Sequence, residues 1–339
     1  MKWVFSYKFD TYGFLTKFKA RLCVRGDRQP WNELDMYAAT LAGTTFRVLM
    51  AICAKFDLKT CQFNTVNAFT NSDLDETIYC EMPKGFKRRG WCWKLLKALY
   101  GLRRSPLLWY RELSSKLKEL GLEPIYEDAC VFHDGKILVF FYVDDIIVMF
   151  RKESQARFEQ VKRGLFQAYE MKDLGELKWF LGIQIIRDRL NRKLWLCQSA
   201  YIEKIAARFH LQGIGRTRAD IPMKTNNLVK YEGEASANSV EFYQSKVGSV
   251  QYPATITRAD VARTTTKLAE FLLNPGPVHH EAADQCIRYL HNTKNLAICY
   301  SGSADDALIC ISDASFADHV SDRKSSQGYV IKLFGGLIL

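Results

Sequence analysis

The clearest hydrophobic block in the chain is an apolar run that two adjacent carboxylates interrupt. Residues 138–143 and 146–150 are almost entirely aliphatic or aromatic, and Asp144 and Asp145 stand between them. Two β-prone runs joined this closely predict a buried hairpin with an acidic tip. Asp tolerates the backbone angles of a tight turn, so a purely structural role for the pair stays open. Burial favours a chemical role, because two charges beside so much apolar surface need a neutralising partner such as a divalent cation.

Elsewhere, the spacing of apolar residues predicts helices and strands in mixed order. Helical spacing occurs at residues 44–56, 105–120, 158–169 and 199–209, and over 239–294 with a break at 275–277. Strand-like runs occupy residues 3–9, 14–24, 58–64, 180–186, 193–197, 297–300, 308–312 and 328–333. Because no regular βαβ repeat emerges, the predicted class is α+β. We predict three regions, residues 1–212, 213–294 and 295–339, with the first boundary in a polar connection at 213–238.

The composition adds a basic bias that the hydrophobic pattern does not reveal. The 339 residues include 48 Lys or Arg against 37 Asp or Glu, a formal charge of +11. Such a chain suits a polyanionic partner, although a generally basic globular protein stays an alternative. Ten cysteines occur without any C-x-x-C spacing, which indicates a reducing compartment and no structural zinc. No apolar run approaches the ~18 residues of a membrane span, so we expect an intracellular chain with no membrane partner.

One segment, residues 84–104, concentrates this charge and is called the basic segment below. It holds eight Lys or Arg and no Asp or Glu, with four aromatic residues interleaved. Cationic groups bind phosphates and aromatic faces stack on bases, so we predict nucleic-acid contact here, against the alternative of a solvated basic face. The candidate binding residues are Trp91, Trp93, Lys94, Lys97 and Arg103. Residues 1–30 also alternate aromatic with basic side chains, as in a solvated ribbon or a clamp over phosphates.

Seven motifs, in order, resemble the reverse transcriptase region of copia-type LTR retrotransposon polyproteins. They are Lys19-Ala20-Arg21-Leu22, Asn67-Ala68-Phe69, Leu95–Leu102 with Ser105-Pro106, Tyr142-Val143-Asp144-Asp145, Met171–Gly175, Phe180–Ile183 and Ser312–Ser315. The resemblance covers nearly the whole chain. It implies a right-hand polymerase, with fingers and palm in residues 1–212, a thumb or connection in 213–294 and an incomplete ribonuclease H-like segment in 295–339.

The resemblance also implies the chemistry and the partners of an RNA-directed DNA polymerase. Two Mg²⁺ ions would serve nucleotidyl transfer, and the partners would be an RNA or DNA template-primer and a dNTP. The chain would once have been part of a larger polyprotein, located in a cytoplasmic virus-like particle or in the nucleus. An unrelated two-metal nucleotidyltransferase would need the same carboxylates but neither Lys172 nor the Leu181-Gly182-Ile183 strand.

Transferred position by position, the family's roles fall on named residues of this chain. Asp144 would be a metal ligand, Asp145 a supporting carboxylate at the metal, and Lys172 a neighbour of the leaving pyrophosphate. Phe69 would lie under the sugar as a ribose filter, and Lys19 or Arg21 would meet the triphosphate. Leu181 and Gly182 would hold the primer strand.

One position departs from the family in a way that concerns catalysis. The family places an Asp five residues before the ribose-filter aromatic, and this chain has Asn64 there. An amide offers a carbonyl oxygen but no negative charge, so it bridges two dications poorly. We expect the rate of nucleotidyl transfer to be lower by at least ~10²–10³-fold than with an Asp at this position. Two hypotheses follow: a polymerase with impaired chemistry, and a non-catalytic nucleic-acid-binding relic of the polyprotein.

The last motif carries a second departure. Asp313 resembles the first carboxylate of a ribonuclease H, whose other acids come from later strands and a helix that this sequence does not contain. We therefore expect Asp313 to be a remnant without hydrolytic activity.

Overall fold

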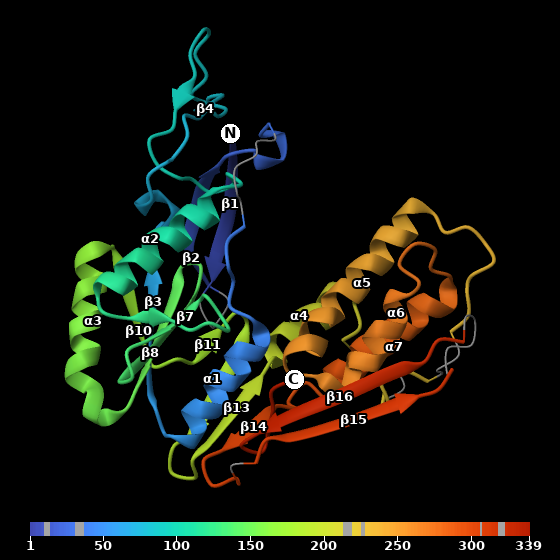
Figure 1. The fold of residues 1–339 in the computed structure, drawn as a ribbon. Coiled ribbons are helices and arrows are strands. Elements are labelled where there is room, and N and C mark those ends of the chain that lie inside the picture. The colour runs from blue at the N-terminus through green and yellow to red at the C-terminus, as the bar shows by residue number, and fades with distance from the viewer. Residues whose placement is uncertain (10–13, 31–36, 213–218, 225–227, 306, 318–322) are drawn as a thin grey trace. The chain divides into compact units, whose positions relative to one another are not determined.

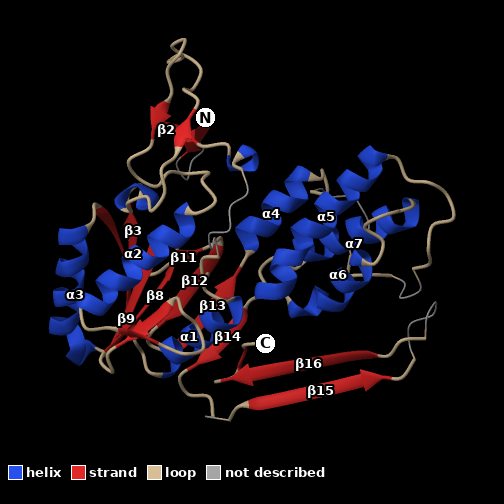
Figure 2. Ribbon diagram, turned by 45° about the horizontal axis from the view of Figure 1, so that its top comes forward, coloured by secondary structure: helices blue, strands red, loops and turns tan. Residues whose placement is uncertain are grey.

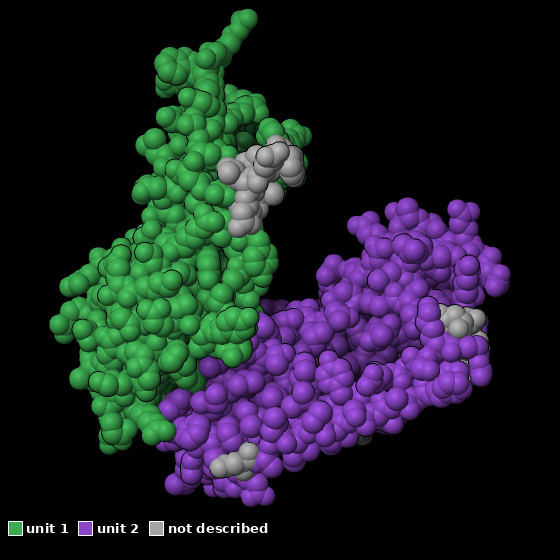
Figure 3. Space-filling model, in the orientation of Figure 1, with its two compact units in different colours: residues 1–41, 59–176 green, residues 42–58, 177–339 purple. Residues whose placement is uncertain are grey.

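The computed structural model describes residues 1–9, 14–30, 37–212, 219–224, 228–305, 307–317 and 323–339, and Figure 1 traces the fold. Helices and strands are mixed along the chain, which confirms the predicted α+β class (Figure 2). The chain divides into two compact units (Figure 3). Unit 1 comprises residues 1–41 and 59–176, and unit 2 comprises residues 42–58 and 177–339.

Unit 1 is built on a six-stranded sheet with the order β10-β3-β9-β8-β7-β6. Its strands are β3 (Lys59–Thr65), β6 (Glu123–Pro124), β7 (Val131–His133), β8 (Ile137–Tyr142), β9 (Asp145–Phe150) and β10 (Met171–Gly175). Every neighbouring pair is antiparallel. Strands β8 and β9 form the predicted hairpin, and their apolar residues supply the centre of the core. The predicted buried hairpin is therefore confirmed.

Two amphipathic helices accompany this sheet, α2 (Ser105–Glu119) and α3 (Gln155–Ala168) (Figure 1). Each buries one apolar stripe, which the helical spacing predicted. The stripes consist of Leu107, Leu108, Trp109, Leu113 and Leu117 in α2, and of Phe158, Val161 and Leu165 in α3. Stacking of Phe158 on Phe150, with ring centroids 4.2 Å apart, fixes α3 against the sheet.

Smaller elements complete unit 1. They are the hairpin β1 (Lys2–Phe9) and β2 (Leu15–Cys23), the pair β4 (Tyr79–Cys80) and β5 (Trp93–Lys94), and the short helices η1 (Gly26–Arg28), η2 (Ala68–Asn71) and η3 (Lys152–Ser154). The basic segment therefore lies in loops and one two-residue strand, up to the start of α2.

Unit 2 combines two sheets with a helical cluster. The first sheet contains β11 (Trp179–Phe180), β12 (Ile183–Asp188), β13 (Lys193–Cys197) and β14 (Ile298–Ser301), and the second contains β15 (Ile309–Ser315), β16 (Ser326–Leu333) and β17 (Gly336–Leu337). The helices are α1 (Gly43–Lys55), α4 (Ser199–Arg208), α5 (Ala237–Ile256), η4 (Ala259–Val261), α6 (Ala262–Ala269) and α7 (Pro277–Asn292). Helices α4 to α7 share an apolar core centred on Tyr243, Val250 and Leu268.

The predicted helices at 44–56, 105–120, 158–169 and 199–209 are confirmed to within a few residues as α1 to α4. The strand β10 was not predicted as such, because its sequence has no apolar alternation. The proposed boundaries after residues 212 and 294 stay predictions, and residues 213–218 and 225–227 of the polar connection lie outside the described residues. Among the described helices, none has the length and apolar character needed to cross a lipid bilayer.

Candidate functional site

Three strands of unit 1 bring the predicted polar residues into one row. Asn64 on β3 is paired with Lys172 of β10 on one side and with Asp145 of β9 on the other. Directly paired residues of antiparallel strands point to the same face of a sheet. The amide Nδ2 of Asn64 donates a hydrogen bond to Oδ2 of Asp144 at 3.3 Å. The predicted convergence of Asn64, Asp144 and Asp145, called the acid cluster below, is therefore confirmed as geometry.

The turn that carries Asp144 is strained and held from two sides. Val143 and Asp144 join β8 to β9, and Val143 has φ 54°, a region that β-branched residues rarely adopt. The indole Nε1 of Trp109 donates to the Val143 carbonyl oxygen at 2.7 Å, and the Thr65 amide donates to the Asp144 carbonyl oxygen at 2.8 Å. Such strain persists only where surrounding contacts impose it, and it is common at functional sites.

Burial and charge act together on Asp145. Burial raises the pKa of its carboxyl group above the ordinary value, and the neighbouring charge of Asp144 adds to that rise. Hydrogen bonds from the side-chain amides of Gln62 and Asn64 oppose it. The Gln62 bond joins Nε2 to Oδ1 of Asp145 at 3.3 Å. The two carboxylates thus repel each other, and hydrogen bonds from the neutral amides of Gln62 and Asn64 oppose the effect of that repulsion on Asp145.

The side chains of the acid cluster determine how many of the expected metal ions could bind there. In the described part of the chain, no group of three or more His, Cys, Asp and Glu side chains could hold a metal ion. Hard cations such as Mg²⁺ prefer carboxylate oxygens. Two adjacent carboxylates suit one such ion, but two ions need a third negative ligand, which Asn64 does not provide. The residues therefore fit one Mg²⁺ and not two.

An aromatic pair lies beside the acid cluster. Phe69, in η2, meets the ring of Tyr100 edge to face with the centroids 4.7 Å apart. The guanidinium carbon of Arg21 lies 5.9 Å from the Tyr100 centroid. Burial, followed by the negative charge of Asp144, raises the pKa of the Tyr100 hydroxyl, which places this ring in the field of the acids. Sequence reasoning missed Tyr100, for which the only signal was an aromatic residue within the basic segment.

The other predicted nucleotide residue, Lys19, lies on the same strand as Arg21. It is half-buried on β2, opposite Ser6 of β1. Since alternate residues of a strand share a face, Lys19 and Arg21 point to the same side of the hairpin. Lys172, on the edge strand β10, is exposed.

The predicted primer-binding residues belong to unit 2. Leu181 and Gly182 form the two-residue turn between β11 and β12, with φ values of 50° and 80°. Two consecutive residues in the left-handed region are typical of a tight hairpin turn. The hydroxyl of Tyr252 donates to the Leu181 carbonyl oxygen at 2.5 Å, which holds the turn in place. Their role at the primer stays a prediction.

The structure divides the candidate residues of the basic segment into two groups. Trp91, 71% exposed, and Lys94 face solvent. Lys97 instead forms an ion pair with Asp73 at 2.7 Å, and Nε of Arg103 donates to the Gly26 carbonyl oxygen at 2.8 Å. The second group therefore has structural contacts that the sequence did not reveal.

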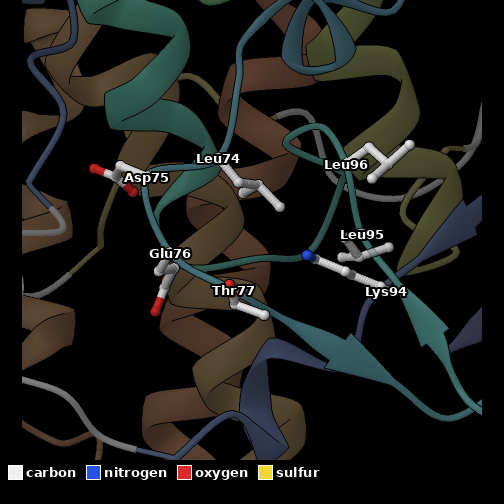
Figure 4. Close-up of a pocket in the computed structure, with 7 residues that line it drawn as sticks. All are labelled: Leu74, Asp75, Glu76, Thr77, Lys94, Leu95 and Leu96. Atoms are coloured by element: carbon white, nitrogen blue, oxygen red, sulfur yellow. The ribbon is translucent and has the colours of Figure 1, made fainter.

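An open hollow of about 340 Å³ lies beside Lys94. Figure 4 shows the Lys94 side chain extending towards the wall that contains Leu74 and Thr77, while the Asp75 carboxylate points away from it. The remaining lining residues are Glu76, Leu95 and Leu96. No member of the acid cluster lines this hollow, so it is separate from the row of polar residues.

Aromatic rings continue from the basic segment onto the N-terminal hairpin. Trp93 packs against Phe86 with the centroids 6.0 Å apart, and Phe86 lies 6.3 Å from Trp3. The register of β1 and β2 then places Trp3, Phe5, Tyr7 and Phe18 on one face, of which the last three are 72%, 64% and 72% exposed. Exposed aromatic rings on this scale indicate a binding surface.

Asp313 lies in β15, opposite Gly328 of β16. Its carboxylate accepts a hydrogen bond from the Ala314 amide at 2.9 Å, and the whole strand is exposed. Among the described residues, Asp313 belongs to no group of three or more His, Cys, Asp and Glu side chains that could hold a metal ion.

Comparison with known proteins decides the family. A family model described as "Reverse transcriptase (RNA-dependent DNA polymerase)" matches residues 1–225. The chain belongs to this reverse transcriptase family. A putative transposon Ty5-1 protein of Saccharomyces cerevisiae is 31% identical over 79% of the chain and 88% of its own length. The predicted resemblance to copia-type retrotransposon reverse transcriptases is thereby confirmed, and with it, at the level of the family, the right-hand polymerase class.

Plant retrotransposons provide further relatives. The Retrovirus-related Pol polyprotein from transposon TNT 1-94 of Nicotiana tabacum is 34% identical over 99% of the chain, and that from transposon RE1 of Arabidopsis thaliana is 30% identical over 98%. The chain spans 26% and 23% of these two polyproteins, about a quarter of their length. Among solved structures, a foamy viral protease-reverse transcriptase in complex with double-stranded DNA matches 95% of this chain and 48% of its own, with 14% identity and a TM-score of 0.46.

Proposed function

We propose that this reverse transcriptase domain of a copia-type retrotransposon binds template-primer and dNTP but transfers nucleotides feebly or not at all. The observation that carries the proposal is the amide of Asn64, which occupies the centre of the acid row and donates to Asp144 at 3.3 Å. Asn and Asp have nearly the same shape, so the substitution keeps the geometry and removes one negative charge. Loss of such an electrostatic group lowers rates by at least ~10²–10³.

Asp144 and Asp145 would hold one Mg²⁺ ion, and the carbonyl of Asn64 would be a weak further ligand if the amide turned. When bound, Mg²⁺ supplies positive charge that stabilises the attacking oxygen and the triphosphate. The chain's own contribution is positioning. The strained turn and the Trp109 bond fix Asp144, and the pairing with β3 fixes Asp145.

The nucleotide would lie between the acid cluster and the aromatic pair. Phe69 would contact the sugar, and Arg21 or Lys19 would meet the triphosphate. Lys172, directly opposite Asn64, would lie near the leaving pyrophosphate. Leu181 and Gly182 would contact the primer.

Template-primer binding would use the exposed part of the basic segment and the aromatic face of the hairpin. Lys94 and Trp91 face solvent there, as do Arg88 and Arg89. Phosphates attract the cations, and bases stack on exposed rings irrespective of sequence. Trp93 and Arg103, which are half-buried, would support this surface, and exposed Lys97 would be held in it by its ion pair with Asp73.

Primer extension by the native chain and by an Asn64→Asp variant tests the proposal. We expect the native chain to extend poorly and the variant to extend at least ~10²-fold faster, because the third carboxylate is restored. Asn238→Asp is the matched control, since it makes the same chemical change at an exposed position of unit 2.

Robust extension by the native chain would disprove the loss of activity. Inactivity of a folded Asn64→Asp protein that still binds template-primer would favour the alternative function, a non-catalytic nucleic-acid-binding relic of the polyprotein.

A further inference from the structure

Tyr100 stands where three elements of unit 1 meet, and none of the roles assigned above uses it. Its backbone carbonyl accepts a hydrogen bond from the Val24 amide, just beyond β2, at 2.8 Å. Its ring meets Phe69 of η2 at an interplanar angle of 65°, and Arg21 of β2 lies over the same ring. Asp144, on the hairpin turn, acts on its hydroxyl electrostatically. A single side chain thus connects the proposed sugar, triphosphate and metal contacts.

The backbone next to Tyr100 is closely packed against the segment that contains Val24 and Gly26. Gly101 has φ 90°, and a Cβ atom there would lie 2.1 Å from the Val24 carbonyl oxygen. A Cβ atom on Gly26 would lie 2.1 Å from the Gly101 carbonyl oxygen. The two chain segments therefore touch backbone to backbone, which only glycine permits. These backbone contacts fix the main chain from which the Tyr100 ring extends.

We propose that Tyr100 is a positioning residue for nucleotide selection, whose ring holds Phe69 in the orientation that excludes a 2′-hydroxyl group. This inference rests on the proposed nucleotide site. Phe69 is 9% exposed, and the edge-to-face contact with Tyr100 limits the directions in which its ring can turn. Without the ring, Phe69 gains room to turn away, and a ribonucleotide sugar fits beside it. The hydroxyl of Tyr100 is not needed for this steric effect.

The experiment measures nucleotide binding, so it does not depend on catalysis. Each protein is bound to a template-primer whose primer ends in a dideoxynucleotide, in Mg²⁺. The Kd values for the next correct dNTP and for the matching rNTP are then compared. The variants are Tyr100→Ala, Tyr100→Leu, Tyr100→Phe and Phe69→Ala, each also prepared with Asn64→Asp. Tyr110→Ala is the matched control, since Tyr110 lies on α2 and its hydroxyl donates to the Ala129 carbonyl oxygen.

We expect Tyr100→Ala to reduce the preference for dNTP over rNTP by about tenfold, as Phe69→Ala does, because an aromatic contact that orients the filter is lost. Tyr100→Phe and Tyr110→Ala should keep the native preference. Tyr100→Leu keeps apolar bulk without a flat ring, and it should also lower the preference for dNTP over rNTP. This variant tests the inference if Tyr100→Ala does not fold.

Two results would overturn the inference. The first would leave the proposed function standing, and the second would contradict the proposed nucleotide site as well. If Phe69→Ala loses the preference while Tyr100→Ala and Tyr100→Leu keep it, Tyr100 has no part in selection and the proposed function stands. If neither the native chain nor Asn64→Asp binds any nucleotide while template-primer binding persists, the proposed nucleotide site itself is wrong.

Discussion

Within unit 1, the acid cluster lies on paired strands of the sheet and on the turn between β8 and β9, whereas the basic segment at residues 84–104 lies in loops and one two-residue strand that precede α2. The geometry of the acid cluster depends on the register of the paired strands, since moving Asn64 by one residue would turn its side chain to the opposite face of the sheet. The attraction of the basic segment for phosphates depends on the sum of many surface charges, each of which contributes a small part.

Under the proposed function, this contrast would allow catalysis to be lost while nucleic-acid binding survives. In that proposal, one amide in place of one carboxylate removes a charge that the chemistry requires, while the side chain keeps its size and its amide donates a hydrogen bond to Asp144. Nothing in the packing of the sheet opposes that change. In a basic surface no single residue is essential in this way, because the affinity for nucleic acid falls stepwise as cations are removed.

The largest expected effect concerns Asp144. In an Asn64→Asp chain, adding Asp144→Asn should lower the rate of primer extension at least ~10²-fold, because the same charge deficit returns at a neighbouring position. Single-turnover extension measures the rate, and filter binding checks that template-primer affinity is unchanged. Asp305→Asn, an exposed acid of unit 2, is the control. An undiminished rate would place the catalytic centre elsewhere.

The basic segment should respond more moderately. Replacing Arg88, Arg89 and Lys94 with Ala should weaken template-primer binding about tenfold or more at low salt and reduce its salt dependence, because about three phosphate contacts are lost. Replacing Lys97 and Arg103 should instead lower stability, because they contact Asp73 and Gly26.

A triple variant of Lys204, Lys224 and Lys230, exposed residues of unit 2, makes the same change in net charge and should bind almost normally. Equal losses in both triple variants would show that only the overall charge matters.

A third prediction concerns the ion pair that the last residue of the basic segment, Arg104, forms with Asp75. Arg104, 8% exposed, donates to both oxygens of Asp75, with Nη2 at 2.5 Å from Oδ2. Arg104→Ala should lower the free energy of unfolding by about 2 kcal/mol at pH 7, because a charged hydrogen bond is lost. The side-chain bond from Arg104 lowers the pKa of Asp75. The contribution is therefore present above the ordinary Asp pKa and is lost as the pH falls through the lower value in the folded state.

Urea unfolding at pH 7 and at pH 2.5 measures this difference. We expect the gap between the native chain and Arg104→Ala to shrink in acid, and Arg104→Lys to lie between the two at pH 7. A gap of the same size at both pH values would contradict an origin in the ionised pair.

The smallest expected effect is at Asp313. The native chain should not hydrolyse an RNA–DNA hybrid in Mg²⁺ or Mn²⁺, and Asp313→Asn should change nothing, because in the described residues the carboxylate belongs to no group of three or more side chains that could hold a metal ion. Cleavage that disappears with Asp313→Asn would refute this.

The sequence alone determined the elements that depend on local spacing. The hairpin of β8 and β9 and the helices α1 to α4 follow from apolar periodicity, which acts over a few residues. The acid motif was also legible from its apolar flanks, and the amide at position 64 from its place five residues before Phe69. Local order and motif spacing were therefore sufficient to predict the family, which the comparisons confirm, while the departure at position 64 stays a prediction.

Only the tertiary structure decided which side chains meet. It pairs Lys172 with Asn64 although 107 positions separate them, brings Tyr100 to Phe69, and turns Lys97 and Arg103 towards Asp73 and Gly26. These contacts depend on strand pairing and loop closure between distant segments, for which a basic or aromatic residue carries no local signal. A composition rich in Lys and Arg shows that cations are available, but the packing around each one determines whether it faces a phosphate or another part of the chain.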